Sequence, residues 1–242
     1  MDWESTAIVL GLQDYSEEMM IMLVLTVGHG LRKGMIKSTK KNKSALAVGN
    51  IIKARWSARL EAHLGTFAIQ SHEAIAQFVY HERKKLLALL SICELFKVCL
   101  PEKEPQAMLY TNLEDFLYAL RFNNPLWTNL FVMLELELLS KVGFGLDLDK
   151  CAATGSTKNL AYISPWTGKA VASEPGEKYK EKLFTIPKLF LEPSQLQEDK
   201  EIAAALRVIR YFFLKNVFLN KQNQCPSALI TLEKIFSDKV VA

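Results

Sequence analysis

The stretch from residue 50 to residue 60, NIIKARWSARL, alternates between apolar and polar side chains and decides the fold class of its half of the chain. From Ile52 to Ala58 the even-numbered positions are apolar, and from Lys53 to Arg59 the odd-numbered positions are basic or hydroxylic. Because successive side chains of a strand point to opposite faces, this period of two predicts a half-buried strand with its cations in water.

Four more segments of the first eighty residues read as short strands: residues 6–12, 19–26, 31–37 and 65–70. Turn-forming residues separate them, including the tight reversal Gly28-His29-Gly30 and a polar, basic loop from Lys40 to Ser44. Five short strands in one small domain favour a closed β-barrel, of which the OB-fold is the leading case.

After Ser71 the apolar residues recur at helical spacing, which predicts a second, mainly α-helical domain. Capping residues and prolines bound its expected helices. We expect helices over residues 72–100, from Thr111 onward, from Asn124-Pro125 to Val142, from Ser194 to about Leu219, and from Pro226 to Phe236. Glycines and prolines make residues 146–192 an irregular segment. The expected fold class is α+β, with an OB-fold domain over residues 1–79 and a helical domain over residues 80–242.

Charge is distributed unevenly along the chain, whose net charge is +4. Residues 1–30 contain five acids and no Lys or Arg, whereas residues 31–60 contain nine bases and no acid. A basic run is most often a solvated face, but the lack of any acid over the whole window favours a surface that binds a polyanion. We expect one groove lined by all nine cations, because we place strand 31–37 next to strand 51–60: Arg32, Lys33, Lys37, Lys40, Lys41, Lys43, Lys53, Arg55 and Arg59.

Composition bounds the setting in which the protein works. Half of the 242 residues are apolar, which is enough for a packed core, yet no apolar run reaches the roughly 18 residues of a membrane span. The first residues carry Asp2 and Glu4 in place of the basic start of a signal peptide. The four cysteines contain no CxxC pair and are too few for a disulfide framework. We therefore expect a soluble protein of the reducing cytoplasm that makes no membrane contact.

The sequence contains no recognisable catalytic motif. Dinucleotide- and phosphate-binding loops, the nucleophile elbow and the metalloprotease motif are all absent, and the four histidines are far apart. The pair Glu114-Asp115 is better explained by electrostatics at a helix start than by acid–base catalysis. We expect a protein that is not an enzyme and needs no cofactor.

Several short blocks, in one order along the chain, carry a resemblance to a known family. The order begins at Trp3 and continues with WSARL at 56–60, HLG at 63–65, LELLSKVGFG at 136–145, YISP at 162–165 and GKAV at 168–171. Together these blocks resemble the RecO family of bacterial recombination mediators, most closely its alphaproteobacterial form.

The resemblance implies a DNA-binding OB barrel joined to a helical domain. Proteins of this family bind single- and double-stranded DNA and anneal complementary strands. With RecR they help load RecA onto strands coated by single-strand-binding protein (SSB), and they use no nucleotide or cofactor. The implied partners are therefore DNA, RecR and SSB, with RecA reached indirectly, in the cytoplasm and at the nucleoid during repair.

The irregular segment departs from the family pattern. Many relatives bind zinc there with four cysteines, whereas only Cys151 remains here and Thr154 stands three positions later. One thiolate cannot close a tetrahedral zinc site, so we expect no metal. We expect the packing of Tyr162 and Trp166 to hold the segment instead.

A second departure concerns the capture of SSB. Some relatives receive the acidic, Phe-ending tail of SSB with the help of an Arg-Phe-Glu-Leu run, which reads Met133-Leu134-Glu135-Leu136 here. Arg210 and Lys215, beside Phe212 and Phe213, are the alternative residues for that partner.

Two other functions fit the same residues. An RNA-binding OB-fold protein of translation or the ribosome would use similar phosphate contacts, which do not distinguish RNA from DNA. A non-catalytic adaptor would use its helices to bind proteins and its cations only for solubility. Competition between single-stranded DNA and RNA tests the first, and a lack of salt-sensitive nucleic-acid binding would favour the second.

Overall fold

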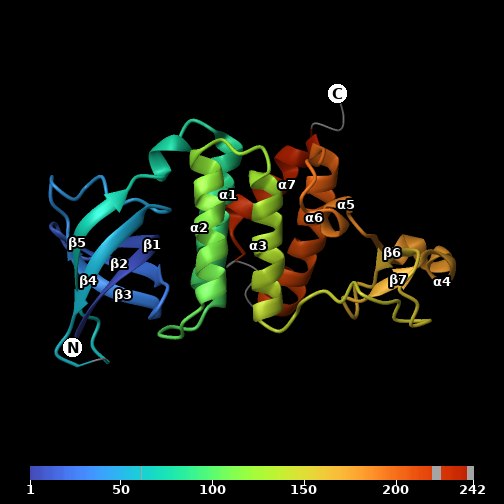
Figure 1. Cartoon of the computed structure of the whole chain (residues 1–242), viewed down its shortest axis with the longest axis horizontal. Helices are drawn as coiled ribbons and strands as arrows, with labels where there is room; N and C mark the ends of the chain where they lie inside the picture. Colours follow the sequence, from blue (N-terminus) through green and yellow to red (C-terminus); the bar gives the residue numbers. More distant parts are fainter. Residues whose placement is uncertain (61, 220–224, 239–242) are drawn as a thin grey trace. The chain divides into compact units, whose positions relative to one another are not determined.

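The computed structural model describes residues 1–60, 62–219 and 225–238, and the chain divides into two compact units (Figure 1). The first unit, Met1–Trp127, contains a five-stranded sheet and two long helices. The second unit, Thr128–Ala242, contains helices and a small sheet. Among the described residues, no helix is long and apolar enough to cross a membrane.

The five strands of the first unit close into a barrel in the order β1-β2-β3-β5-β4. All neighbours pair antiparallel except β3 and β5, which are parallel and meet only at Met35 and Thr66. This closed, five-stranded arrangement is that of an OB-fold, so the predicted fold class is confirmed. The strands are β1 (Asp2–Asp14), β2 (Met19–Thr26), β3 (Gly30–Lys37), β4 (Ile51–Ser57) and β5 (Thr66–Glu73).

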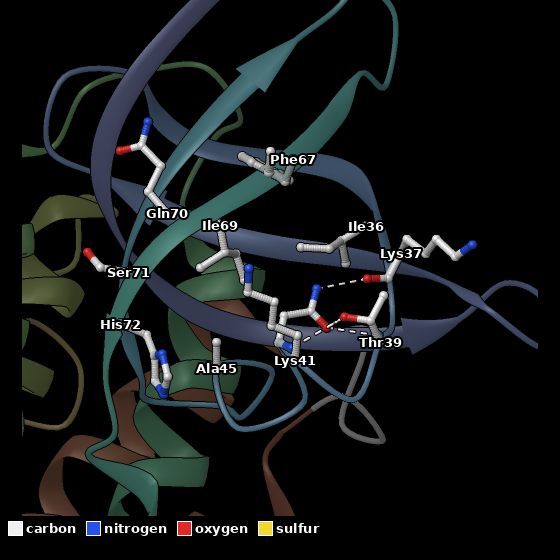
Figure 2. A pocket seen from close by; sticks show the side chains of 12 residues that line it. Ile36, Lys37, Thr39, Lys41, Ala45, Phe67, Ile69, Gln70, Ser71 and His72 are labelled. Atoms are coloured by element: carbon white, nitrogen blue, oxygen red, sulfur yellow. Dashed lines mark hydrogen bonds between the residues drawn. The ribbon is translucent and has the colours of Figure 1, made fainter.

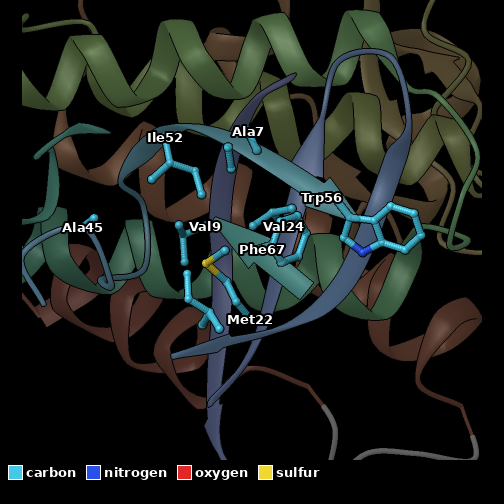
Figure 3. Packing of buried hydrophobic residues seen from close by; sticks show 10 residues of the cluster. Ala7, Val9, Met22, Val24, Ala45, Ile52, Trp56 and Phe67 are labelled. Carbon is cyan, nitrogen blue, oxygen red and sulfur yellow. The ribbon is translucent and has the colours of Figure 1, made fainter. Parts of the chain in front are cut away.

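Alternation in β4 fills the barrel as predicted. Trp56 is 2% exposed and lies inside with the other apolar residues of the barrel core (Figure 3), whereas Lys53 and Arg55 are exposed outside. The indole Nε1 of Trp56 donates a hydrogen bond to the Leu64 carbonyl at 3.1 Å. Gly65 follows with a φ of +69°, and a Cβ there would lie 2.4 Å from the Trp56 ring, so only glycine fits.

The helix expected over residues 72–100 begins later. His72 and Glu73 extend β5 through their pairing with β4, and helix α1 runs over Arg83–Cys99 after the short 3-10 turn η1 (Ala76–Phe78). The Asn50 side chain explains the delay, because its Oδ1 accepts the backbone N–H groups of Ile75 and Ala76 at 2.9 and 3.1 Å. The helical spacing of apolar residues in the sequence gives no indication of these hydrogen bonds between distant segments.

The helix expected from Thr111 onward begins earlier. Helix α2 runs over Ala107–Arg121, so Thr111 lies inside it and its hydroxyl donates back to the Ala107 carbonyl at 3.1 Å. Helix α3 (Trp127–Lys141) follows, and the Asn124 side chain accepts the Leu126 N–H at its start, as the Asn-Pro pair predicted.

The long helix expected from Ser194 is shorter and changes type. Helix α6 runs over Asp199–Phe212, continues as the π-helical turn η3 (Phe213–Val217), and is followed by α7 (Ser227–Asp238). Residues 193–195 stay outside the helix because the Asn129 amide donates to the carbonyls of Pro193 and Gln195. Part of the expected C-terminal region, residues 220–224 and 239–242, lies outside the described residues.

The segment expected to be irregular contains a small three-stranded sheet. Its order is β7-β6-β8, and α4, η2 and α5 are short turns beside it. Trp166 is 86% exposed, which corrects the expectation that this ring packs the segment together. The bounds are β6 (Leu160–Ile163), β7 (Ala170–Ala172), α4 (Ser173–Gly176), η2 (Glu177–Lys182), β8 (Phe184–Thr185) and α5 (Lys188–Leu191).

Helices α1 and α2 belong to the same compact unit as the barrel. A Cβ at Gly49 would meet the Leu89 side chain at 2.6 Å, and one at Gly11 would meet the Lys97 side chain at 3.2 Å. Helix α1 therefore lies directly against the barrel. A cut between residues 79 and 80, the expected domain boundary, would separate these packed surfaces.

Candidate nucleic-acid interface

The seam between β3 and β5 opens into a pocket of about 340 Å³ (Figure 2). The two strands diverge beyond their single pairing at Met35 and Thr66, and the loop after β3 folds beside the gap. Ile36 and Ile69 face each other across the pocket in Figure 2, and Lys37 and Lys41 line its edge. The pocket thus joins an apolar interior to two cations.

The exposed face of β5 continues this surface toward β4. Ala68 pairs with Arg55 and Ser71 pairs with Lys53 across the strands, and both β5 residues also line the pocket. Neighbouring strands lie about 5 Å apart, so the β4 cations are close to the pocket rim. β5 is consequently flanked by basic side chains from β4 on one side and from β3 and its loop on the other.

The structure corrects the expected arrangement of the nine cations in two respects. β5 lies between β3 and β4, so the two basic strands are not neighbours. Arg32 does not face water with Lys33: it is 7% exposed, and its Nε donates to the His29 carbonyl at 3.1 Å. Lys40 and Lys43 are exposed in the loop after β3, and Arg59 is exposed after β4.

Aromatic rings surround Arg32 at one end of the barrel. The Trp3 ring stacks on His29 at 4.2 Å and on Trp56 at 5.5 Å between centroids. The Arg32 guanidinium lies 6.0 Å from the centroid of Trp3 and 5.8 Å from that of Trp56, within cation–π range. Arg32 therefore stabilises this end of the barrel as well as adding a positive charge to the candidate interface.

A second pocket, of about 230 Å³, adjoins this end of the barrel. Arg32, Lys33, His63 and Lys103 line it together with one carboxylate, Glu102. The second pocket therefore has a basic lining, which suits it to an anion. His63 and Lys103 come from loops outside residues 31–60, the basic window predicted from the sequence.

Three of the expected cations already have carboxylate partners. The Nζ of Lys33 lies 2.6 Å from Glu102, that of Lys37 lies 2.8 Å from Glu18, and Arg55 pairs with Asp2. Hydrogen bonding to Lys37 lowers the pKa of Glu18, and the same contact raises the pKa of Lys37. All three pairs are exposed, so each contributes little to stability and competes with an incoming phosphate.

Five of the nine cations have no such carboxylate partner among the described residues. Over residues 1–60, 62–219 and 225–238, no ion pair is formed by Lys40, Lys41, Lys43, Lys53 or Arg59. Three of these five are in the loop after β3, beside the seam pocket. This loop therefore presents the largest uncompensated charge of the predicted set.

Removing the partner of Lys33 is expected to strengthen polyanion binding. Glu102→Gln should raise the affinity for a single-stranded oligonucleotide a few-fold at low salt and less at high salt. In this variant Lys33 can contact a phosphate without first giving up its ion pair with the Glu102 carboxylate. Fluorescence anisotropy at several salt concentrations measures this change. Glu198→Gln, which removes an equal charge beside Lys200 in the second unit, is the matched control. An equal gain in both variants would show that only net charge matters.

The seam residues Gln70, Ser71 and His72 were not anticipated as site residues. Their signal was present in the strand order, because a five-stranded OB barrel places the fifth strand between the third and the fourth. In the sequence, Trp3 appeared only as part of the family resemblance and His29 only as part of a tight turn. Their stacking depends on the closure of β1 on β4, which brings Trp3 opposite Trp56.

The residues expected to receive a protein partner are differently placed. Phe212 and Phe213 are buried, which corrects the expectation that their rings are available at the surface. Arg210 pairs with the buried Glu233 at 2.6 Å. Lys215 is bound to the backbone of residues 165 and 166, to which its Nζ donates.

Cys151 accepts hydrogen bonds in the segment where the family resemblance implies a zinc site in relatives. The Thr154 hydroxyl, followed by the backbone N–H of Ala172 at 3.2 Å, lowers the pKa of this thiol to about 7. Among the described residues, no three or more His, Cys, Asp or Glu side chains gather as a metal site would require. A metal-free protein remains our prediction, and elemental analysis finding one zinc per chain would contradict it.

Cys151 is expected to ionise before the other thiols. Burial raises the pKa of Cys93 and of Cys99 to about 12 and also raises that of Cys225, so thiolate absorbance should show one step near pH 7 that Cys151→Ser removes. Because the folded pKa lies below the unfolded one, this thiolate stabilises the fold above pH 9 and the effect is lost as pH falls through 7. The stability difference between wild type and Cys151→Ser should therefore grow from pH 6 to pH 9. A pH-independent difference would contradict this assignment.

Comparison with protein families agrees with the two-part organisation of the chain. The family described as recombination protein O N terminal matches residues 1–78, and recombination protein O C terminal matches residues 80–223. The two matches together cover nearly all of the first compact unit and residues 128–223 of the second.

Individual relatives are similar over nearly their whole length. The DNA repair protein RecO of Wolbachia pipientis wMel is 34% identical over 231 residues, which are 93% of this chain and 96% of that protein. That of Anaplasma marginale (strain St. Maries) is 36% identical over 222 residues, 90% of this chain and 92% of that protein. That of Rhodospirillum centenum is 35% identical over 232 residues, 94% and 92% of the two chains. With both family models matched and these relatives aligned end to end, this chain belongs to the RecO family of DNA repair proteins.

Proposed function

We propose that this chain is a mediator of DNA repair that binds single- and double-stranded DNA through its barrel and anneals complementary strands. In this proposal it helps load RecA onto strands coated by SSB, acting together with RecR. The observation that supports it is the outer face of β5, which carries the seam pocket and is flanked by cations from β4 and from the loop after β3. No catalytic step and no cofactor enter the proposal.

The charge distribution explains how one surface accepts both single and double strands. Phosphate contacts by Lys and Arg supply affinity without reading sequence, and they release counterions from either polymer. The seam pocket adds a place for an unstacked base, which only a single strand offers freely. The proposed site of action is the cytoplasm, at the nucleoid, where such strands arise during repair.

The deciding experiment is annealing of two complementary oligonucleotides by the purified full chain. The proposal expects faster annealing than in buffer alone, with an effect that weakens as salt rises. Preference for single-stranded RNA over DNA of equal length would favour an RNA-binding function instead. Absence of salt-sensitive binding to either polymer would leave only the adaptor function.

A further inference from the structure

Trp166 is the most exposed large apolar side chain among the described residues, at 86%. It lies in the turn between β6 and β7, where the chain reads SPWTG over residues 164–168. A ring so exposed packs against almost nothing and adds little to the core of its unit. A single exposed ring is ordinary, whereas a contiguous exposed surface marks a contact site for a partner or ligand, so the neighbours of Trp166 decide its meaning.

A lysine from another element holds this turn in place. The Nζ of Lys215 donates to the carbonyls of Pro165 at 2.6 Å and Trp166 at 3.1 Å, and lies 5.2 Å from the centroid of the Trp166 ring. Lys215 belongs to the π-helical turn η3, an uncommon form that often occurs at functional sites. The exposed ring is therefore presented by a fixed turn, with a cation beside it.

Further aromatic and basic side chains extend the surface along α6. Tyr211 lies four residues before Lys215, 6.0 Å from its Nζ, and packs edge-on against Phe184. Arg207, four residues earlier again, is exposed on the same face of the helix. We name the surface formed by Trp166, Lys215, Tyr211 and Arg207 the aromatic patch.

The patch is basic. Residues 202–219 contain three bases and no acid, and residues 161–172 contain one base and no acid. Two acids from other segments partly offset this charge, since Glu233 lies 3.7 Å from Arg207 and Asp147 lies 3.6 Å from Lys169. Cations and aromatic rings alternate in the patch, and bases outnumber acids around it. Such a surface suits an acidic ligand that also has flat faces.

We propose that the aromatic patch is a second contact for single-stranded nucleic acid, with a base stacked on Trp166 and phosphates on Lys215 and Arg207. Stacking on an aromatic ring needs only one open face, which this protruding ring offers, whereas a peptide side chain needs a pocket to fill. A duplex hides the faces of its bases inside the stack, so the patch selects single strands. Trp166 lies in the second unit and none of the nine cations of the basic window belongs to the patch.

The inference concerns a surface other than the barrel site. It rests on the proposed function for one point only, namely that the ligand is a nucleic acid. A chain with two nucleic-acid contacts binds two strands, or two parts of one strand, at once. Two complementary strands held by one chain meet at a raised effective concentration. The patch should therefore contribute more to annealing than to simple binding.

The test compares Trp166→Ala, Trp166→Phe and, as a matched control, Tyr179→Ala, which removes another exposed ring of the same unit. Stacking predicts that Trp166→Ala lowers affinity for a single-stranded oligonucleotide about 5-fold or more and slows annealing further, while duplex affinity is unchanged. Trp166→Phe should keep most of the affinity but lose the quenching of tryptophan fluorescence by the oligonucleotide. The control should behave as wild type.

Photo-crosslinking of an oligonucleotide that contains 5-bromodeoxyuridine locates the contact directly, with the crosslinked peptide expected at residues 164–168. Unchanged single-strand affinity and annealing in Trp166→Ala, or an equal loss of duplex binding, would overturn the proposal. So would binding of poly-glutamate that depends on Trp166 while oligonucleotide binding does not. Changing Lys40, Lys41 and Lys43 to Glu separates the two surfaces: an effect there with none at Trp166 would refute the patch alone, and the reverse would refute the barrel site alone.

Discussion

Reversing the charge of Lys40, Lys41 and Lys43 together should lower the affinity for single-stranded DNA roughly 50-fold at about 0.15 M salt. Each phosphate contact contributes about 0.7 to the slope of log K against log salt, so losing three should flatten that slope by about 2. These lysines are exposed and form no ion pair with any described residue, so all three can contact phosphate. Anisotropy titrations at several salt concentrations measure both quantities.

The matched control reverses three other exposed lysines, Lys141, Lys200 and Lys234. It changes the net charge by the same amount but leaves the loop after β3 intact. The control should weaken binding only slightly and keep the slope of the wild type. If both triple variants lose affinity equally, the effect comes from net charge, and the loop is only a solvated face.

The barrel shows how far local pattern in the sequence reaches. Short apolar runs between turn-forming residues located the other four strands, and period-two alternation located β4 and placed Trp56 inside and Lys53 outside, because these properties are encoded locally in the sequence. The order of strands is a property of the whole barrel. Treating β3 and β4 as neighbours therefore merged into one groove cations that β5 separates.

The misplaced element boundaries have the same origin. The helix starts expected at residues 72 and 194 failed because Asn50 and Asn129 bind the backbone of distant segments. The basic window gave the charge of the candidate site, but not its ion pairs, since Asp2, Glu18 and Glu102 lie outside the window and meet it only after folding. Burial of Phe212 and exposure of Trp166 were likewise set by tertiary packing rather than residue type.

Truncating the central ring of the barrel should have the largest effect on stability. Trp56→Ala removes a fully buried indole, its hydrogen bond to the Leu64 carbonyl and its contact with Trp3, and we expect a loss of about 3–5 kcal/mol. Such a loss is comparable to the whole stability of a small domain. The barrel unit should therefore unfold at a lower denaturant concentration and lose its DNA affinity, and Trp56→Phe should recover part of both.

Trp166→Ala is the matched control, because it makes the same chemical change at a ring that is 86% exposed rather than 2% exposed. It should shift the unfolding midpoint very little. Because two compact units need not unfold together, the midpoint is followed by near-ultraviolet circular dichroism and by tryptophan fluorescence in parallel. Equal midpoints for the two alanine variants would mean that Trp56 does not hold the barrel together. The barrel would then depend instead on closure of its strands and on the covering helix α1.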